Sequence, residues 1–395
     1  MHISSHLTSH DHRVMLATKV NYCIPEGVFT SPLWDKRSEM EITMENENKQ
    51  QTPHKRRVRY KGKYPKRFEE KYKELNPEKY QDTIEHVIRK GNTPAGMHIS
   101  IMVPEIIDFL QIKPGQTGFD ATLGYGGHTR AMLEQLNGEG HMYATDVDPE
   151  ESARTRKRLA NLGFGEDILT IKLQNFCTID EIAREAGGFD FLLADLGVSS
   201  MQIDNPKRGF SFKIDGPLDL RLNQKEGISA ASRLEHISRE ELAGMFYENS
   251  DEPYSDEIAK AITEYIRRGN HVDTTTKLRQ IIEETLSFLP EKDRKDTVKK
   301  TCQRVFQALR IDVNNEFEVL YEFMGKLPDA LKPGGRAAIL TFHSGEDKLV
   351  KKALKTGYKA GIYSEYSKDV VRPSAQECAQ NPRARSTKMR WAVKA

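Results

Sequence analysis

The stretch DFLLADLGVSSMQIDNPKRGFSFKIDGPLDLR, residues 190–221, begins as an apolar run and becomes a long polar loop at Asp195. Its apolar part, together with Phe189, has the length and composition of a buried strand. The loop is crowded with glycine, serine and aspartate, which favour turns and are costly to place together in a plain connection. We therefore expect a strand that delivers the Asp195 carboxylate, and a shaped loop after it, into one functional site. The plainer alternative is a solvated surface loop.

Strand-like and helix-like segments alternate on the N-terminal side of this stretch. Apolar runs typical of strands occur at 117–121, 141–145 and 168–173, and helical patterns separate them. A Pro-Gly-Gly turn and another apolar run, within residues 331–344, repeat the pattern later in the chain. This alternation predicts an α/β fold with a Rossmann-like, doubly wound sheet of parallel strands. Ligands of such sheets bind beyond the carboxyl ends of the strands.

Two of the expected strands end in residues suited to bind an adenosine. Asp120 closes the first strand, and the loop TLGYGGH at 122–128 follows it in front of a helix. Glycines let the backbone approach a ligand closely, but Thr129 stands where the dinucleotide pattern GxGxxG requires a third glycine. The second strand ends at Asp146, whose carboxylate can accept hydrogen bonds from both hydroxyl groups of a ribose. Together they predict an adenosine-containing cofactor.

Three more side chains near strand ends each have two interpretations. Asp195 can accept a hydrogen bond from an amino group of the cofactor or from an amine of the substrate. Phe176, shortly after the third strand, either contacts an adenine ring or belongs to the core. His343 follows the late strand directly, where a catalytic and a structural histidine are equally expected.

Composition limits the class of protein. The chain has 395 residues, a net charge of +2 and no run of eighteen apolar residues, so a membrane span is not expected. Its four cysteines lie far apart without a CxxC pair, which argues against a disulfide framework and against a zinc site. We therefore expect a cytoplasmic protein that holds no metal.

Basic segments stand near both ends of the chain. Residues 1–92 are expected to form a largely disordered extension, and residues 55–68 within it carry eight basic, three aromatic and no acidic side chains. That mixture suits contacts with nucleic acid, although a basic tail that only aids solubility fits equally well. Residues 383–394 carry five basic side chains and no acid, and are expected to be available for phosphate contacts.

A purely helical pattern interrupts the α/β alternation between residues 229 and 300. Apolar residues recur there at helical spacing, and a single helix over 304–331 is then expected to return the chain to the sheet. The predicted organisation is a sheet domain in two parts, 93–224 and 301–395, with an all-helical insertion at 225–300. The insertion would form the far wall of a substrate cleft.

Seven ordered motifs resemble the bacterial methyltransferases that modify N4 of a cytosine in 16S, or small-subunit, ribosomal RNA. They are DATLGYGGH at 120–128, DLGVSS at 195–200, RGFSF at 208–212, DGPLDLR at 215–221, RVFQALR at 304–310, FHS at 342–344 and NPRARS at 381–386. The resemblance covers His98 to the C-terminus and implies S-adenosylmethionine as the cofactor. By position it implies cofactor contacts at Gly126, Gly127, His128, Asp146, Phe176, Asp195 and Gln202. The implied partner is small-subunit ribosomal RNA or an assembling 30S subunit.

The chemistry of an exocyclic amine suggests roles for further residues. The N4 lone pair of cytosine is delocalised into the ring, so an acceptor must hold the amine and align it with the methyl group. Asp195 is the catalytic candidate for that acceptor, and His343 is the other catalytic candidate. The base must also leave its stack, and Phe210, Phe212 or Phe342 could hold it.

Other functions are not excluded by the sequence. Tyr125 and Gly345 depart from the family pattern, so a paralogue that acts on a different RNA cytosine is an alternative. A nicotinamide dehydrogenase would share the sheet and the ribose-binding acid, but Thr129 counts against it. A non-catalytic RNA-binding protein of ribosome assembly would keep the basic segments without needing a cofactor pocket. The sequence leaves open whether the protein forms a homodimer.

Overall fold

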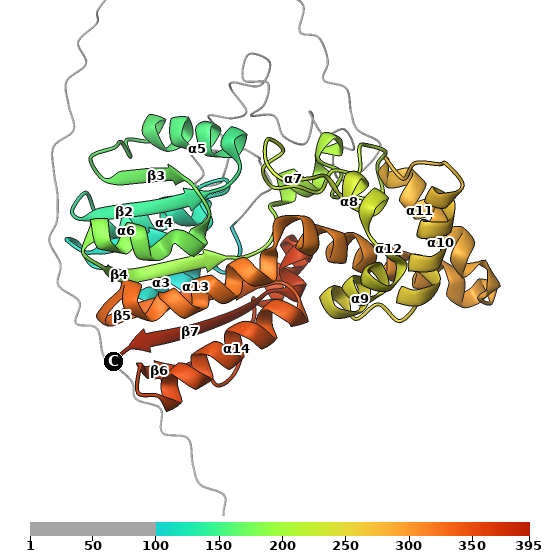
Figure 1. The fold of residues 1–395 in the computed structure, drawn as a ribbon. Helices are drawn as coiled ribbons and strands as arrows, with labels where there is room; N and C mark the ends of the chain where they lie inside the picture. The colour runs from blue at the N-terminus through green and yellow to red at the C-terminus, as the bar shows by residue number, and fades with distance from the viewer. Residues whose placement is uncertain (1–99) are drawn as a thin grey trace, which may run out of the picture. The chain divides into compact units, whose positions relative to one another are not determined.

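The computed structural model describes residues 100–395, and within them seven strands form one sheet in the order β3-β2-β1-β4-β5-β7-β6 (Figure 1). The predicted N-terminal extension and its basic segment lie outside the described residues. The strands are β1 Thr117–Asp120, β2 His141–Asp146, β3 Leu169–Leu173, β4 Phe189–Asp195, β5 Leu331–Thr341, β6 Tyr363–Tyr366 and β7 Lys388–Lys394. The strands expected near residues 117, 141, 168, 189 and 331 are all present.

Parallel pairing brings the carboxyl ends of the first five strands to one edge of the sheet. β1 lies between β2 and β4, β3 pairs with β2, and β5 pairs with β4. The strand order reverses at β1, which is where a doubly wound sheet opens a crevice for ligands. The predicted α/β fold is confirmed.

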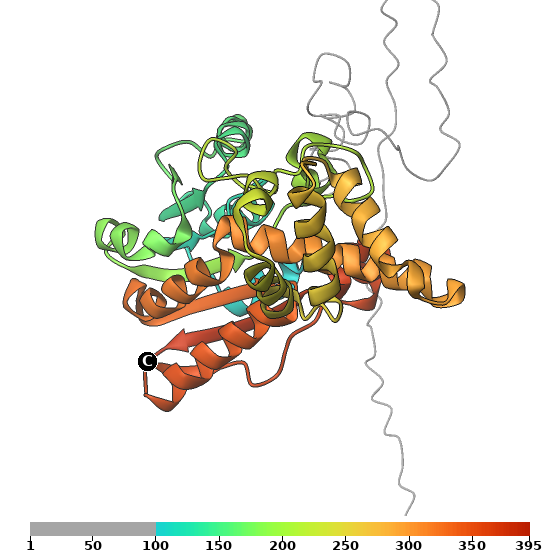
Figure 2. The same ribbon diagram turned by 45° about the vertical axis from the view of Figure 1, so that its right-hand side comes forward.

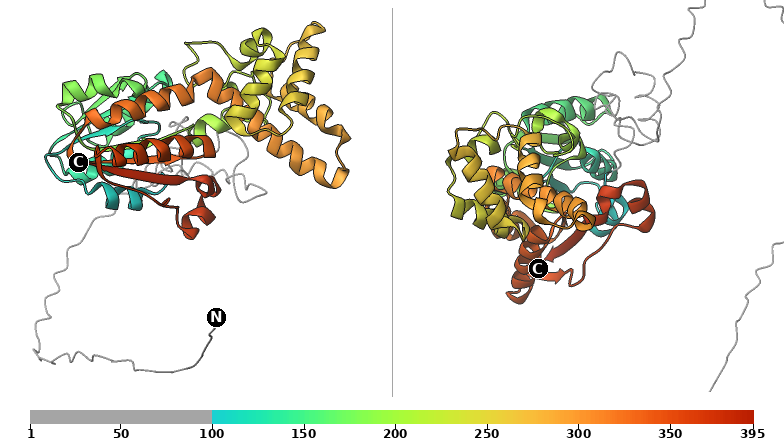
Figure 3. Two further views of the ribbon diagram at one scale, coloured as in Figure 1. Left: turned by 60° about the horizontal axis from the view of Figure 1, so that its bottom comes forward. Right: turned by 90° about the vertical axis from the view of Figure 1, so that its right-hand side faces the viewer.

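Helices cover both faces of the sheet because its central strands are apolar on both sides. Leu192 of β4 packs in one buried cluster and Leu193 in the other, as neighbours along a strand point to opposite faces. One cluster involves α6 Ile179–Ala186, α13 Glu316–Ala330 and α14 Ser344–Lys359, and the other α3 Val103–Leu110, α4 Gly127–Leu136 and α5 Pro149–Asn161. Figure 3 shows α14 lying along β7.

The chain between β4 and β5 is helical, as the sequence predicted. After the short helix α7 Ser200–Asp204 it forms α8 Ala230–His236, α9 Arg239–Ser250, α10 Ser255–Arg267, α11 Thr275–Thr285 and α12 Glu291–Asn314. Helices α8 to α12 are gathered together without a strand among them (Figure 2). Their apolar cluster runs from Leu218 to Leu309. The predicted boundary between residues 300 and 301 therefore falls inside α12, and this cluster favours a later boundary.

The single helix expected over 304–331 is wrong. Asn315 has a φ of 49°, a left-handed conformation, and separates α12 from α13. Asparagine tolerates that conformation better than most residues, so the break needs no glycine or proline that the sequence would reveal.

The basic C-terminal segment is also different from the expectation. Residues 388–394 form β7, which pairs antiparallel with both β5 and β6. Arg390 is buried, and its Nε donates to Asp347 Oδ1 at 2.6 Å, while Lys388 Nζ donates to Asp347 Oδ2 at 2.9 Å. These two cations are thus neutralised inside the fold, and the expectation that they are available for phosphate is wrong. Because Lys388 and Arg390 are charged, this segment was interpreted as a basic tail and its strand was not predicted.

In the part of the chain that the structure describes, no helix has both the length and the apolar composition needed to cross a membrane.

Candidate active site

A pocket of about 540 Å³ opens at the carboxyl ends of β1, β2 and β4. The glycine loop, the strand ends, the loop after β3 and the short helix η5 Pro382–Ser386 contribute to its lining. The lining includes all seven positions expected to contact the cofactor: Gly126, Gly127, His128, Asp146, Phe176, Asp195 and Gln202. His343 is not part of the lining, although its neighbours Phe342 and Glu346 are.

The glycine loop is held in a backbone conformation that places it close to α5. Gly124 and Gly126 have φ values of 44° and 78°, and a Cβ on Gly126 would lie 2.7 Å from Thr155 Cγ2. The Thr155 hydroxyl donates to the Gly124 carbonyl at 2.7 Å, and the Arg158 guanidinium donates to the Tyr125 carbonyl while lying 3.6 Å from the Tyr125 ring centroid. The loop therefore leaves room for a ligand against its backbone in front of α4.

Asp146 has the geometry of a ribose acceptor. Its Oδ2 accepts the Gly124 N–H at 2.8 Å, and its Oδ1 accepts the Asp148 N–H at 2.9 Å. Burial, with the nearby carboxylates of Asp148 and Glu151, raises the pKa of Asp146 to about 6. Each oxygen keeps a lone pair, so two hydroxyl donors of a ribose would complete the hydrogen bonding of this carboxylate. The pocket thus fits an adenosine-containing cofactor.

Gln202 is tied into the protein at both ends of its amide. Its Oε1 accepts the Ser199 N–H at 2.9 Å, which forms a capping box with the Ser199 side chain at the start of α7. Its Nε2 donates to Asp148 Oδ2 at 3.1 Å. One amide hydrogen remains for a ligand, so the main effect of Gln202 is to order the loop beside the pocket.

Asp148 holds the site together and was not predicted from the sequence. Its side chain is 1% exposed and accepts the N–H groups of Glu150 and Glu151 at the start of α5. The same carboxylate accepts a hydrogen bond from Arg208 Nη1, with an N···O distance of 2.7 Å. Arg208 Nη2 also donates to the carbonyls of Arg221 and Leu222, so one buried ion pair joins the end of β2 to both halves of the long loop. The sequence DVDP at 146–149 could have identified Asp148, because this second acid directly precedes a proline that starts a helix.

Asp195 lies at the end of β4 beside His128. The distance from Asp195 Oδ2 to His128 Nδ1 is 3.4 Å, and His128 Nε2 lies 2.9 Å from the Ile101 carbonyl oxygen. Burial above all, and the charges of Asp120 and Glu346, raise the pKa of Asp195 to about 6, although His128 lowers it. Asp195 Oδ1 is buried without a hydrogen-bond partner among the described residues. An acceptor that lacks a donor is available for a ligand amine.

Phe176 belongs to the core and also lies at the pocket. The side chain lines the pocket, and its ring also meets Phe323 edge to face at a centroid distance of 5.1 Å. It is half-buried and packs against the cluster that contains α13. One face of the ring thus supports the core while the residue still borders the pocket.

A charge network at the break between α12 and α13 borders the pocket. Arg310 donates to both carboxylate oxygens of Glu316 at 2.8 Å, and Glu346 Oε2 accepts the Phe342 N–H at 2.8 Å. His343 Nε2 lies 3.1 Å from Glu346 Oε1. Glu316, His343 and Glu346 each place a possible metal ligand within 4.8 Å of the others. Because Arg310 already neutralises Glu316, we interpret the cluster as structural ion pairing.

The three phenylalanines proposed to hold a target base lie in different places. Phe342 lines the pocket, whereas Phe210 and Phe212 pack against the helical cluster, where Phe212 meets Phe306 at 5.8 Å between ring centroids. Of the three, Phe342 is thus the one placed to contact a base at this site.

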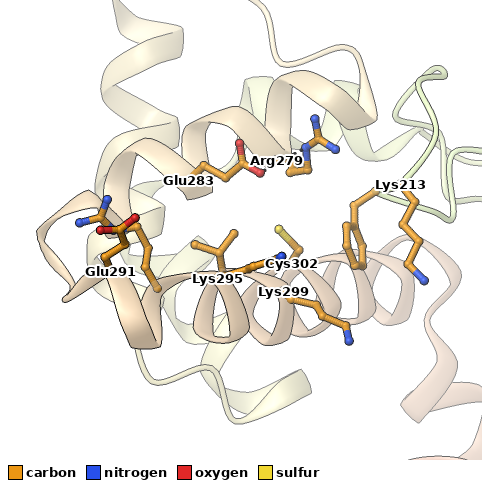
Figure 4. Close-up of a pocket in the computed structure, with 10 residues that line it drawn as sticks. Lys213, Arg279, Glu283, Glu291, Lys295, Lys299 and Cys302 are labelled. Carbon is orange, nitrogen blue, oxygen red and sulfur yellow. Dashed lines mark ion pairs between the residues drawn. The ribbon is translucent and has the colours of Figure 1, made fainter.

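A second pocket, of about 560 Å³, lies between α11 and α12 (Figure 4). Its floor includes Phe212, Val298 and Cys302, and burial raises the pKa of the Cys302 thiol to about 12. Its rim carries the cations Lys213, Arg279, Arg294, Lys295 and Lys299 and the acids Glu283 and Glu291. Within residues 100–395 the three lysines form no ion pair, whereas Arg279 lies 3.5 Å from Glu283. The rim is therefore net positive.

Comparison with known proteins shows the family of the chain. Residues 95–395 match the sequence model of the MraW methylase family. The chain belongs to the MraW methylase family. It is 84% identical over 342 residues to ribosomal RNA small subunit methyltransferase H 1 of Agathobacter rectalis, with 87% of this chain and 98% of that protein aligned. It is 68% identical over 359 residues to the protein of the same name in Lachnoclostridium phytofermentans, with 91% and 98% aligned.

A third relative has the number 2 instead of 1 at the end of its name. Ribosomal RNA small subunit methyltransferase H 2 of Alkaliphilus metalliredigens is 62% identical over 340 residues, with 86% of this chain and 97% of that protein aligned. Membership in the family confirms the predicted methyltransferase class and S-adenosylmethionine as its cofactor. The dehydrogenase alternative is therefore not favoured.

Proposed function

We propose that this MraW methylase transfers a methyl group from S-adenosylmethionine to N4 of a cytosine in 16S ribosomal RNA. The observation that carries the proposal is the single pocket that contains the glycine loop, Asp146 and Asp195 at adjacent strand ends. The names of the relatives, ribosomal RNA small subunit methyltransferase H, support the choice of RNA. We place this activity in the cytoplasm, because ribosomal subunits assemble there.

The proposed catalytic contribution is positioning followed by removal of one proton. The bound cofactor would supply an electrophilic methyl group. Asp146 would hold the ribose, the backbone of Gly126 and Gly127 would border the cofactor, and Asp195 would accept a hydrogen bond from the target amine. Phe342 would contact the base after it leaves its stack. Asp195 can accept the amine proton only when ionised, which its pKa of about 6 allows at neutral pH.

We also propose that the second pocket receives the phosphate backbone of the substrate RNA. Three unpaired lysines next to an apolar floor that includes Phe212 combine a charge for phosphate with an apolar surface for an unstacked base. Arg385 adds an exposed cation at the lining of the cofactor pocket, while Arg383 donates to Asp204 at 2.8 Å and holds η5 in place. The RNA would then contact both the helical insertion and the sheet domain.

The decisive experiment is methyl transfer from labelled S-adenosylmethionine, with naked 16S RNA and with 30S particles that lack the modification as separate substrates. Mass spectrometry of nuclease fragments then locates the methylated nucleotide. We expect one N4-methylcytosine per RNA, in one substrate form or both. Label on another RNA, or at another atom, would replace the proposed target. Binding of RNA without any transfer would favour a non-catalytic role in ribosome assembly.

Charge reversal tests the second pocket separately. We expect Lys295→Glu with Lys299→Glu to raise KM for RNA and flatten its salt dependence, because fewer counterions are released on binding. Affinity for the cofactor should not change. Lys292→Glu with Lys300→Glu, on the same helix but outside the pocket, is the control matched in charge. Equal effects of the two changes would mean that total charge, and not this pocket, attracts the RNA.

A further inference from the structure

We propose that Arg310 determines the specificity for cytosine, because its guanidinium donates hydrogen bonds to N3 and O2 of the target base. The inference rests on the proposed function and deepens it, since it names the group that distinguishes cytosine from other bases at the same site. Arg310 ends the RVFQALR motif at 304–310, and its side chain lines the cofactor pocket together with Asp195 and Phe342.

The protein occupies only one side of the Arg310 guanidinium. Nε donates to Glu316 Oε1 and Nη2 donates to Glu316 Oε2, both at 2.8 Å. A guanidinium carries five N–H groups in one plane, so this ion pair leaves three of them, one on Nη2 and two on Nη1. Within residues 100–395 none of these three has an acceptor. Nη1 is not enclosed by protein atoms, so it is open to the pocket that the side chain lines.

The free side of the guanidinium matches one edge of cytosine. Because Nε and Nη2 both face Glu316, the remaining hydrogen of Nη2 points in the same direction as one hydrogen of Nη1. Two parallel N–H groups of an arginine fit two adjacent acceptors of a base. In cytosine N3 and O2 are adjacent acceptors, and they lie beside the N4 amine on the same edge. A base whose amine is held at Asp195 can therefore present N3 and O2 to Arg310.

Other bases do not offer the same set of groups. Uracil has an oxygen in place of the amine, and its N3–H would face the N–H groups of Arg310. Adenine has an amine and an adjacent ring nitrogen, but a C–H stands where cytosine has O2. One N–H of Arg310 would then lose its acceptor in a water-poor pocket, and leaving such a donor unpaired is costly. The arginine would thus select cytosine by three groups and not by the amine alone.

The protein holds Arg310 at its backbone as well as at its guanidinium. Asn314 Nδ2 donates to the carbonyl oxygens of Arg310 and Leu220, each at 2.8 Å, and Asn314 Oδ1 accepts the Leu222 N–H. Both amide hydrogens of Asn314 are therefore used, so this neighbour offers no donor to the base. Glu316 fixes the other end of the side chain. A donor that is already oriented loses little freedom when the base binds.

The other two arginines of the pocket lining are placed differently. Arg383 donates to Asp204 at 2.8 Å and its side chain is 38% exposed, and Arg385 is exposed on η5. Exposed cations suit phosphates, which position the RNA but do not identify a base. The side chain of Arg310 is only 15% exposed, at the break between α12 and α13. It is the arginine of this lining that suits the edge of an unstacked base.

A base analogue tests the assignment in the RNA itself. Once the methylated cytidine is located, ligation can replace it in 16S RNA by 3-deazacytidine, which keeps N4 and O2 but has a C–H in place of N3. We compare kcat/KM for the two RNAs and use their ratio. The intrinsic reactivity of the analogue is common to all enzyme variants, so a difference in this ratio between variants reports the contact with N3.

Two variants separate base recognition from structural support. Glu316→Gln keeps the guanidinium and should keep the wild-type ratio. Arg310→Met combined with Glu316→Gln removes the guanidinium without leaving a carboxylate unpaired, and we expect its ratio to be about 10- to 100-fold smaller, because one hydrogen bond to a charged donor no longer distinguishes the two RNAs. Equal slowing on both RNAs, with an unchanged ratio, would show that Arg310 acts only on the structure and would overturn the inference.

Nucleotide binding gives a measurement that does not depend on turnover. The enzyme saturated with S-adenosylhomocysteine is titrated with cytidine 5′-monophosphate and with its 3-deaza analogue, followed by ligand-observed NMR. The wild type should bind the cytidine nucleotide about 10-fold more tightly or better, and the double variant should bind both alike. The absence of a preference in the wild type would refute the inference. If the wild type transfers no methyl group to RNA, the proposed function fails, while this preference still decides the role of Arg310.

Discussion

Replacement of Asp195 by asparagine should make the protein more stable and nearly inactive. The ionised carboxylate is unfavourable in the folded state, because its pKa is about 6 there and 3.8 in an unfolded reference. Such a shift of about two units corresponds to about 3 kcal/mol, at 1.36 kcal/mol per unit. The side chain is partly open to the pocket, so this value is an upper bound.

The sign of the effect depends on pH. A group whose pKa is raised in the folded state destabilises that state when ionised, so the penalty grows as pH rises from about 4 to above 6. Asparagine resembles the protonated acid and avoids the penalty. Urea unfolding should therefore show Asp195→Asn more stable than the wild type by up to about 3 kcal/mol at pH 7.5, and by about half of that at pH 5.

Methyl transfer by the same variant provides the functional half of this prediction. Loss of a positioned proton acceptor usually lowers a rate by about 10²–10⁴-fold, and we expect a fall in that range with cofactor affinity retained. Near-normal turnover would remove Asp195 from the proposed role. A variant less stable than the wild type at pH 7.5 would refute the electrostatic reasoning, because it would mean that the carboxylate stabilises the fold.

Three further changes test the pocket around Asp195. Gly126→Ala should weaken cofactor binding and destabilise the fold, because the new Cβ would lie 2.7 Å from Thr155 Cγ2 in addition to the left-handed strain of about 1–2 kcal/mol. Gly163→Ala has nothing within 4 Å of its Cβ, so urea unfolding of this control should show the loss from left-handed strain alone. Arg208→Met should cost about 3–5 kcal/mol in the same assay, because it leaves a buried carboxylate unpaired. Cofactor affinity, measured by calorimetry, should fall as pH drops below 6 and Asp146 becomes protonated, and an affinity constant from pH 7.5 to 5.5 would exclude that carboxylate as the ribose acceptor.

The parallel half of the sheet was predictable because its signals are local. The helix expected after the glycine loop is present as α4 Gly127–Leu136, since glycines precede it and apolar residues recur at helical spacing. The strand β7 was missed because Lys388 and Arg390 are paired with Asp347, a residue 41 positions from the first of them. A partner so distant in sequence leaves no local pattern, and the same is true of Arg208 and its distant partner Asp148.

Residues distant in sequence hold the loop that begins at Asp195 in its shape. Asp148, at the end of β2, holds Arg208, and Arg208 in turn donates to the Leu222 carbonyl. The Leu222 N–H donates to Asn314 Oδ1 at 2.8 Å, on helix α12 of the insertion. One continuous path of hydrogen bonds therefore runs from the cofactor side of the pocket to the helix that borders the second pocket. These hydrogen bonds fix the shape of the loop relative to the end of β2 and to the helical insertion.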